Sequence, residues 1–230
     1  MHLNDTSLTL LFGRKFLALK FLVTGFGPFP GGRRNPTARL MRALSGQGER
    51  LSRFGIELHA AVLPVHFVEA ASGLRALEAA IEPQAILHFG LAARRKFFSV
   101  ETRACNRLSV LETDISGASP ASRAILAGAP FALRSTFPSH EITAALCHAG
   151  LRTRLSADAG AYLCNEVLYL SLARSRARVT GFIHVPRLRS RCRKKSSVSI
   201  FRPHKDDLVR AALIAIMLSA RKLRQISATA

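Results

Sequence analysis

The chain has 230 residues, 48% of them hydrophobic, and a formal net charge of +20 at pH 7. This length suits one domain, or at most two, with a sizeable buried core. Its four cysteines form no CxxC pair, which argues against a zinc site and a disulfide framework and favours a reducing compartment. Its eight histidines show no close ligand spacing, which also argues against a metal site. We therefore expect no metal and no cofactor.

The positive charge suggests attraction to polyanions, and part of it is concentrated in one stretch. Six cations crowd positions 187–195: Arg187, Arg189, Arg191, Arg193, Lys194 and Lys195. The simplest interpretation is a solvated loop, and the alternative is a patch that binds nucleic acid or acidic surfaces. No zinc finger, RNP motif, helix-turn-helix pattern or aromatic ladder accompanies the charge, so specific nucleic-acid binding is not expected.

No segment has the pattern of a targeting signal or a membrane span. The apolar pieces near the N-terminus are interrupted by Arg14, Lys15 and Lys20. The apolar run at 208–220 is too short to cross a membrane and contains Arg210. We expect a cytoplasmic protein that makes no membrane contact.

Residues 1–18 have the character of an N-terminal extension. Residues 20–29 then predict a buried strand that breaks into a Gly/Pro loop, because a continuous apolar run suits a strand covered on both faces. Loops that leave the C-terminal ends of such strands are where open α/β sheets build sites. Phe26 and Phe29 lie on this loop, and they either plug the sheet edge or form the apolar wall of a site.

Helices and strands alternate in the next part of the chain. A helix with proline near its start, a strand, an amphipathic helix and a buried strand are predicted at 36–44, 56–65, 67–81 and 85–90. This alternation is typical of an α/β fold with a parallel core.

The segment 91–106, which leaves the last of these strands, is polar and basic. Its carboxylate, Glu101, is surrounded by cations. Glu101 belongs either to a salt-bridged surface loop or to a catalytic site in which it holds a histidine, and composition does not choose between them. Residues 107–138 contain several glycines and prolines, which predicts loops with short strands.

The C-terminal half predicts five further elements. They are a helix at 139–147, a strand at 151–156, a helix from about 163 to 172, a strand at 179–185 and a final helix whose apolar face covers 208–220. We expect a single domain over residues 19–223 and a flexible tail at 224–230.

Cys164 follows three small residues, 159–161, and lies where a helix starts. Backbone N–H groups and the helix dipole favour a thiolate there and can stabilise an oxyanion. His184, in the strand 179–185, is a candidate to take the thiol proton and later protonate a leaving amine. The plainer interpretation is that the cysteine packs in the core and the histidine is a satisfied core group. Residue types alone leave both interpretations open.

Three blocks of sequence add information to these patterns. The first is Val23-Thr24-Gly25-Phe26-Gly27-Pro28-Phe29 followed by Asn35-Pro36, the second is Gly90 to Asn106 with Arg95, Glu101 and Ala104, and the third is Ala159-Gly160 through Tyr162-Leu163-Cys164-Asn165 with Gly181-Phe182-Ile183-His184-Val185-Pro186 after it. Together they resemble the pyroglutamyl peptidase type I family, also called pyrrolidone-carboxylate peptidases. Weaker similarity covers most of 20–186 and the final helix.

The resemblance implies a three-layer α/β/α sandwich around a twisted, mostly parallel central sheet. It implies a Cys-His-Glu triad, with Cys164 as nucleophile, His184 as base and acid, and Glu101 orienting the imidazole. The implied reaction removes the N-terminal pyroglutamyl residue from a peptide, so the implied partners are N-terminally pyroglutamyl peptides. Family members often assemble as tetramers, so a homo-oligomer, either a dimer or a tetramer, is expected.

The resemblance also implies a largely apolar substrate pocket. Its residues would be Phe26, Phe29, Leu91, Tyr162 and Leu163. An apolar pocket suits pyroglutamate because cyclisation has removed the terminal charge, whereas a free amine would have to bury an ammonium without a partner.

Several positions depart from the family pattern. Leu91 stands where the family usually has a glutamine that shapes the pocket, glycines are expected near 93 and 94, and Thr102 replaces an arginine. After Pro186 the chain is basic, whereas the family is apolar and acidic. Two alternatives therefore stay open: a relative of the same fold with altered or lost specificity, and a basic protein that binds anions or nucleic acid.

Overall fold

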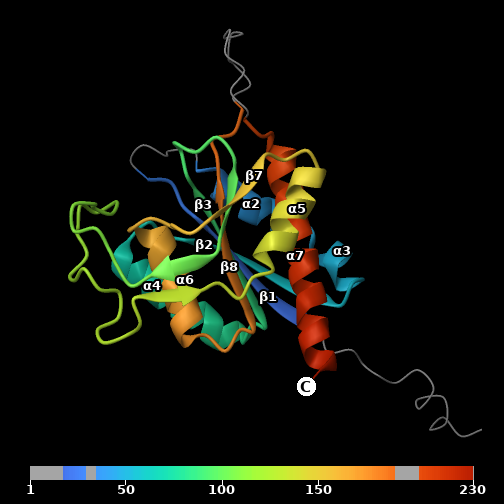
Figure 1. Cartoon of the computed structure of the whole chain (residues 1–230), viewed down its shortest axis with the longest axis horizontal. Helices are drawn as coiled ribbons and strands as arrows, with labels where there is room; N and C mark the ends of the chain where they lie inside the picture. The colour runs from blue at the N-terminus through green and yellow to red at the C-terminus, as the bar shows by residue number, and fades with distance from the viewer. Residues whose placement is uncertain (1–17, 30–34, 190–201, 230) are drawn as a thin grey trace, which may run out of the picture.

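The computed structural model describes residues 18–29, 35–189 and 202–229. Nearly all of the expected N-terminal extension and the cations at 191–195 lie outside these residues. A six-stranded sheet with the order β2-β1-β3-β8-β4-β7 crosses the middle of the molecule, and helices cover both of its faces (Figure 1). The expected three-layer α/β/α arrangement is confirmed.

Four of the strands form the parallel part of the sheet. They are β1 (Leu19–Phe26), β2 (Ile56–Leu63), β3 (Ala85–Leu91) and β8 (Val179–Val185). Strand β8 is buried along its whole length, as expected for a strand covered on both faces. The C-terminal ends of β1, β3 and β8 therefore lie at one edge of the sheet, where the loops can build a site.

The other two strands break the parallel pattern. Strand β4 (Phe98–Glu101) pairs antiparallel with β8, and β7 (Thr153–Ser156) pairs parallel with β4. Outside this sheet, β5 (Arg103–Cys105) and β6 (Ala132–Arg134) form a two-stranded antiparallel ribbon. The antiparallel pairing of β4 with β8 matters for function, because it brings the segment that follows β3 back beside β8.

The helices form the two outer layers. One face of the sheet carries α2 (Pro36–Ser45), the short α3 (Gly48–Ser52), α5 (Ser139–His148) and α7 (Lys205–Ala228). The other face carries α4 (Phe67–Ile81) and α6 (Leu163–Arg174). In Figure 1, α5 and α7 lie to the right of the sheet, and α4 and α6 lie to its left.

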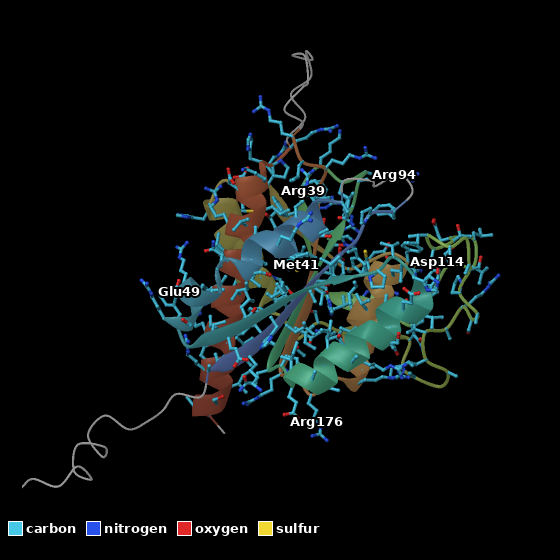
Figure 2. All side chains as sticks on the ribbon, turned by 180° about the vertical axis from the view of Figure 1, so that it is seen from behind. Arg39, Met41, Glu49, Arg94, Asp114 and Arg176 are labelled. Atoms are coloured by element: carbon cyan, nitrogen blue, oxygen red, sulfur yellow. The ribbon has the colours of Figure 1, made fainter. Side chains whose placement is uncertain are left out.

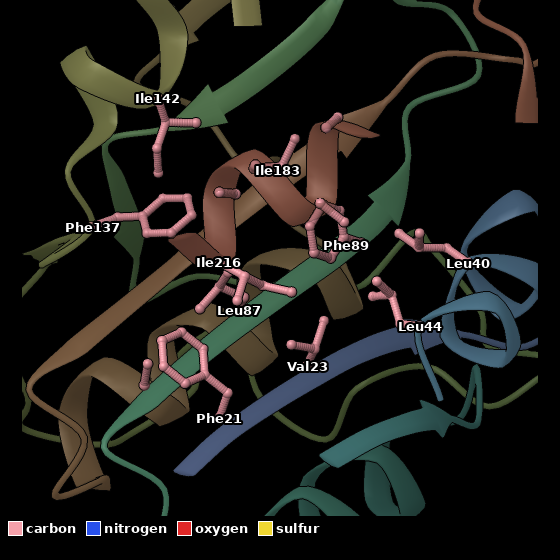
Figure 3. Close-up of a cluster of buried hydrophobic side chains, with 14 of the residues drawn as sticks. Phe21, Val23, Leu40, Leu44, Leu87, Phe89, Phe137, Ile142, Ile183 and Ile216 are labelled. Atoms are coloured by element: carbon pink, nitrogen blue, oxygen red, sulfur yellow. The ribbon is translucent and has the colours of Figure 1, made fainter. Parts of the chain in front are cut away.

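Two apolar clusters, one on each face of the sheet, form the core. Alternate residues of β1 serve different clusters: Phe21 and Val23 pack beneath α2 and α7, and Leu22 packs on the side of α4 and α6. Figure 3 shows the first cluster, in which Ile216 of α7 lies over the sheet. Burying a side chain of this size contributes about 1.5–3 kcal/mol, so both faces hold the layers together.

The C-terminal helix is longer than its apolar pattern predicted. Residues 224–228, expected as part of a flexible tail, continue α7, and their backbone and side chains are tied to neighbouring segments. Arg224 donates a hydrogen bond to the carbonyl oxygen of Phe54, and Arg178 donates to the carbonyl oxygen of Ile226. Among the residues that the structure describes, no helix has the length and apolarity that a bilayer span requires.

Exposed cations are spread over the molecule. Arg39 and Arg94 lie toward one end of the sheet, and Arg176 lies at the opposite end (Figure 2). In the described part of the chain, the positive charge is therefore not confined to one patch.

Candidate active site

Cys164 is the second residue of α6. The chain enters this helix through Gly160, whose φ of 88° is the left-handed conformation that glycine adopts without strain. The Cys164 sulfur faces strand β3 at Gly90, because a Cβ atom built on Gly90 would lie only 2.8 Å from Sγ. The absence of a side chain at Gly90 is thus what lets the thiol approach the sheet.

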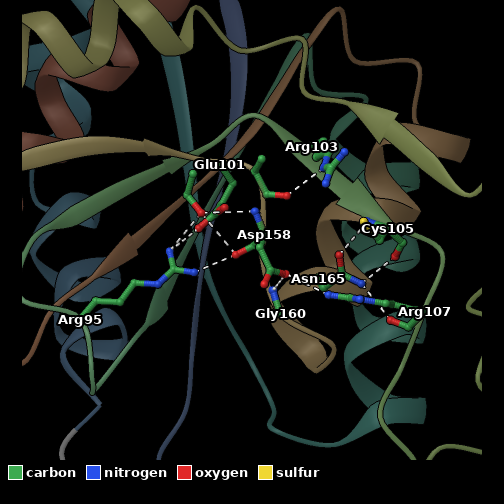
Figure 4. Close-up of polar contacts among 10 residues, drawn as sticks. Arg95, Glu101, Arg103, Cys105, Arg107, Asp158, Gly160 and Asn165 are labelled. Carbon is green, nitrogen blue, oxygen red and sulfur yellow. Dashed lines mark hydrogen bonds and ion pairs between the residues drawn. The ribbon is translucent and has the colours of Figure 1, made fainter.

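Asn165 fixes the start of α6 against the neighbouring ribbon. Its side chain accepts a hydrogen bond from the Cys105 N–H at 2.9 Å, and it donates to the carbonyl oxygens of Cys105 at 2.7 Å and Arg107 at 2.9 Å (Figure 4). The side chain is buried, so these bonds form away from competing water. In the sequence, Asn165 stands out only as part of a motif, and its position there indicates no role of its own.

His184 and Glu101 meet across the antiparallel pair β4–β8. The register pairs Ser99 with His184 and Glu101 with Phe182, which puts all four side chains on one face of the sheet. His184 Nδ1 lies 2.8 Å from Glu101 Oε1. Because a carboxylate only accepts hydrogen bonds, Nδ1 carries the proton and Nε2 keeps a free lone pair.

Arg95 is the second partner of Glu101. Its Nη1 lies 2.6 Å from the same oxygen, Oε1, and its Nη2 donates to the carbonyl oxygen of Asp158 at 2.7 Å (Figure 4). Glu101 is fully buried, and its ion pair with Arg95 offsets part of the cost of burying the carboxylate. Arg95 is one of the matching motif residues in the sequence, but its spacing from Glu101 does not by itself indicate that the two side chains pair.

Gly90 lies between the thiol and the imidazole. In the parallel register of β3 and β8, Gly90 is the partner of His184, while its open α-carbon faces Cys164 Sγ. The Phe182 ring fills the adjacent space, with its centroid 4.6 Å from that of His184. Within the described residues no hydrogen bond joins the Cys164 thiol to His184, and the two residues are related through Gly90, which pairs with one and faces the other.

The environment favours neutral forms of both groups. Burial raises the pKa of the Cys164 thiol to about 12, the Glu101 carboxylate adds to the rise, and Arg95 and the Cys164 backbone N–H oppose it. Burial also lowers the pKa of His184, opposed by its hydrogen bond with Glu101. At neutral pH the resting pair is therefore a thiol beside an uncharged imidazole, which can accept a proton.

Four of the five residues expected to line a pocket belong to one apolar cluster or pack against it. Phe26 and Leu163 are buried members of this cluster, and Phe29 and Tyr162 pack against it together with Cys164. Leu91 ends β3 beside Val185 and is not among the described residues that form this cluster or pack against it.

Tyr162 is held on two sides next to the nucleophile candidate. Its hydroxyl donates to the Thr113 carbonyl oxygen at 2.9 Å, and its ring packs edge-on against Phe67 with centroids 5.4 Å apart.

A separate groove of about 780 Å³ lies on the opposite face of the sheet. It is lined mainly by residues of α7 such as Leu213 and Met217, and it contains none of the residues expected to line the substrate pocket.

Comparisons with known proteins agree over most of the chain. The family model described as pyroglutamyl peptidase matches residues 19–222. The pyrrolidone-carboxylate peptidase of Pyrococcus furiosus is 38% identical over 172 residues, 73% of this chain and 81% of that protein. That of Chromobacterium violaceum is 33% identical over 198 residues, 86% of this chain and 91% of that protein. The solved pyrrolidone carboxyl peptidase from Thermococcus litoralis superimposes with a TM-score of 0.80 at 28% identity, covering 90% of this chain and 96% of that one.

Proposed function

The chain belongs to the pyroglutamyl peptidase family, and we propose that Cys164, His184 and Glu101 are the triad with which it works. The reaction is removal of the N-terminal pyroglutamyl residue from peptides by a cysteine peptidase, as the resemblance implied. The observation that carries the triad assignment is the 2.8 Å bond between His184 Nδ1 and Glu101 Oε1, which leaves Nε2 available as a base on the residue that pairs with Gly90, the glycine that Cys164 Sγ faces.

The first chemical step forms a covalent intermediate. His184 Nε2 takes the proton of the Cys164 thiol as the sulfur attacks the pyroglutamyl carbonyl carbon, and Glu101 stabilises the resulting imidazolium through Nδ1–H. The negative charge that develops on the carbonyl oxygen is stabilised by N–H groups at the start of α6, since the helix dipole is positive there. The carbon–nitrogen bond then breaks, His184 returns its proton to the leaving amine, and a thioester on Cys164 remains.

The second step regenerates the enzyme. A water molecule gives a proton to His184 Nε2 and attacks the thioester carbonyl, which releases pyroglutamate as the thiolate leaves and recovers its proton from the imidazolium. Because the resting thiol has a pKa of about 12, proton transfer to His184 has to accompany attack, so the reaction depends on the base instead of on a preformed thiolate.

Substrate choice in this proposal rests on the apolar group beside Cys164. Phe26, Phe29, Tyr162 and Leu163 would surround the lactam ring, and Leu91 would border the pocket from the end of β3. A peptide with a free N-terminus would have to bury an ammonium among these side chains without a carboxylate partner, and that costs several kcal/mol. The experiment that tests the proposal is release of a fluorophore from a pyroglutamyl amide by the wild-type chain, with loss of release in Cys164→Ala.

The organisation of the protein is part of the same proposal. Residues 19–223 form the catalytic domain, with α7 extending that unit to Ala228, and the domain assembles as a homo-oligomer. Cys105, Cys147 and Cys164 are free thiols in the described part of the chain, which suits a cytoplasmic, reducing location. Light scattering on the purified chain measures the oligomeric state directly.

A further inference from the structure

A hydrogen-bond network of four buried or half-buried polar side chains crosses the face of the sheet that α6 and Cys164 cover. Thr24 Oγ1 lies 2.7 Å from His88 Nδ1, His88 Nε2 lies 3.2 Å from Ser171 Oγ, and Ser171 Oγ donates to Glu78 Oε1 at 2.7 Å. Thr24, His88 and Ser171 are almost completely buried. This hydrogen-bond network thus connects β1, β3, α6 and α4, and the proposed mechanism uses none of its four side chains.

The donors along this network all point the same way. An ionised Glu78 only accepts, so the Ser171 hydroxyl proton points to it, and Ser171 Oγ accepts from His88 Nε2–H. Nδ1 of His88 is then an acceptor for the Thr24 hydroxyl. Every ring nitrogen of His88 has a partner while the imidazole is neutral, and burial lowers the pKa of His88 to about 3, which keeps it neutral.

Ser171 shares a helix face with Cys164. It follows Cys164 by seven positions, and seven residues make almost two full turns of an α-helix. His88 shares a strand face with Gly90, because residues two apart on a strand point to the same side. Helix α6 therefore meets β3 at two points, with Cys164 over Gly90 at one and Ser171 over His88 at the other.

The contact between His88 and Ser171 is unusual among the interactions of α6. Asn165 ties the helix to the β5 ribbon, and Tyr169 donates to the carbonyl oxygen of Pro130. Over residues 18–29, 35–189 and 202–229, the His88–Ser171 bond is the one hydrogen bond that joins α6 to the six-stranded sheet. Other buried side chains of α6, such as Val167 and Leu168, are apolar, and apolar packing is non-directional and sets distance better than register.

We propose that His88 and Ser171 are positioning residues that hold α6 in register on β3 and thereby keep the Cys164 sulfur opposite Gly90, within reach of His184. The proposal rests on the proposed role of Cys164 as nucleophile. If the Cys164 sulfur were displaced along the strand, the apolar pocket would still bind substrate beside it. The sulfur would, however, lose its alignment with the base, His184. Small misplacements of this kind reduce the chemical step more than substrate binding.

The experiment measures kcat and KM separately on a pyroglutamyl amide reporter. Ser171→Ala is expected to lower kcat by about tenfold while KM stays within about twofold, and Ser171→Thr, which keeps the hydroxyl, is expected to recover most of kcat. Ser219→Ala is the matched control, since Ser219 is equally buried but bonds only to the backbone of α7. If Ser171→Ala does not fold, Thr24→Val removes the far anchor of His88 at nearly constant volume and is expected to give the same loss of kcat.

A second readout does not depend on turnover. Iodoacetamide labels Cys164 at a rate that can be compared, within the same sample, with that of the exposed Cys147. The proposal expects this ratio to change about threefold or more in Ser171→Ala and to stay at the wild-type value in Ser171→Thr and Ser219→Ala. A wild-type kcat together with a wild-type labelling ratio in Ser171→Ala overturns the positioning role. An inactive but folded wild type would instead overturn the proposed function, and the labelling ratio would still test the register.

Discussion

His184 Nδ1 and Glu101 Oε1 lie 2.8 Å apart although the two residues are separated by 83 positions in the chain. Arg95 Nη1 approaches the same oxygen at 2.6 Å. One oxygen of Glu101 thus accepts from two donors, the Arg95 guanidinium and the His184 imidazole, and it orients the imidazole. This relationship decides which nitrogen of His184 is free to act as a base.

Replacing Glu101 by glutamine tests that orientation. Glu101→Gln keeps the size of the side chain but removes the charge that stabilises the imidazolium, so kcat is expected to fall by about a hundredfold or more. Glu141→Gln is the control, because Glu141 is an exposed carboxylate paired with Arg221 far from the site. Equal kcat values for Glu101→Gln and Glu141→Gln would remove Glu101 from the triad.

Gly90 is predicted to tolerate no side chain. In Gly90→Ala the new Cβ would lie 2.8 Å from Cys164 Sγ and 2.6 Å from the Phe182 ring, so the variant should lose about 1–3 kcal/mol of unfolding free energy and most of its activity. Gly73→Ala provides the comparison, because that Cβ meets no atom within 4 Å and lies inside α4. It is expected to leave activity unchanged and to gain about 0.5–1 kcal/mol. Urea unfolding and the reporter assay measure both, and an active, stable Gly90→Ala would contradict this packing.

The pH dependence of turnover follows from the neutral resting pair. His184 acts as a base only when unprotonated, and burial lowers its pKa below the usual 6.5. On the acidic side, kcat/KM is therefore expected to be at its maximum at pH 7 and to decline only as the pH falls well below 6.5. An acidic limb centred above pH 7 would mean that the imidazole is charged at rest.

Alkylation of Cys164 gives an independent check on the same pair. With a thiol pKa of about 12, the labelling rate by iodoacetamide is expected to rise continuously up to pH 10. A plateau reached below pH 8 would indicate a preformed thiolate and would contradict the neutral pair.

His88 makes stability depend on acid. Its pKa is lowered from 6.5 to about 3 in the folded chain, so between these values the unfolded state binds a proton that the folded state does not. The contribution of His88 to the free energy of unfolding is then fully present above pH 6.5 and is lost as the pH falls toward 3. The loss is roughly 1.4 kcal/mol per pH unit, on the order of 5 kcal/mol over the whole range. His88→Gln cannot take up this proton and should flatten the slope of unfolding free energy against pH. An unchanged slope would show that His88 does not titrate in this way.

Much of the fold was predictable from local patterns. The expected helix 67–81 and strand 179–185 coincide with α4 and β8, because an amphipathic repeat and a continuous apolar run identify such elements without tertiary information. Strand β4 was not predicted, since its four residues follow a basic loop and owe their conformation to pairing with β8 and β7. The two alternatives left open for Glu101 could not be resolved from the sequence for that reason.

Pairwise contacts in the site were the least predictable part. Cys164 at a helix start and His184 in a buried strand followed from the sequence, but the partners of Arg95 and Asn165 depend on how β4 and β5 fold back. The hydrogen-bond network through His88 was not predicted either, because the sequence pattern of one histidine in an apolar strand is the same with or without a partner on a distant helix. Only the three-dimensional packing distinguishes these cases.

Trapping of the covalent intermediate identifies the nucleophile directly. The wild-type chain is mixed with a fluorogenic pyroglutamyl amide, the reaction is quenched in acid during turnover, and peptides are examined by mass spectrometry. We expect a single pyroglutamyl group on the peptide that contains Cys164. Cys164→Ala should give neither adduct nor fluorophore release, and Cys147→Ala should give normal release. Fluorophore release by a folded Cys164→Ala variant, or an adduct on another residue, would contradict it.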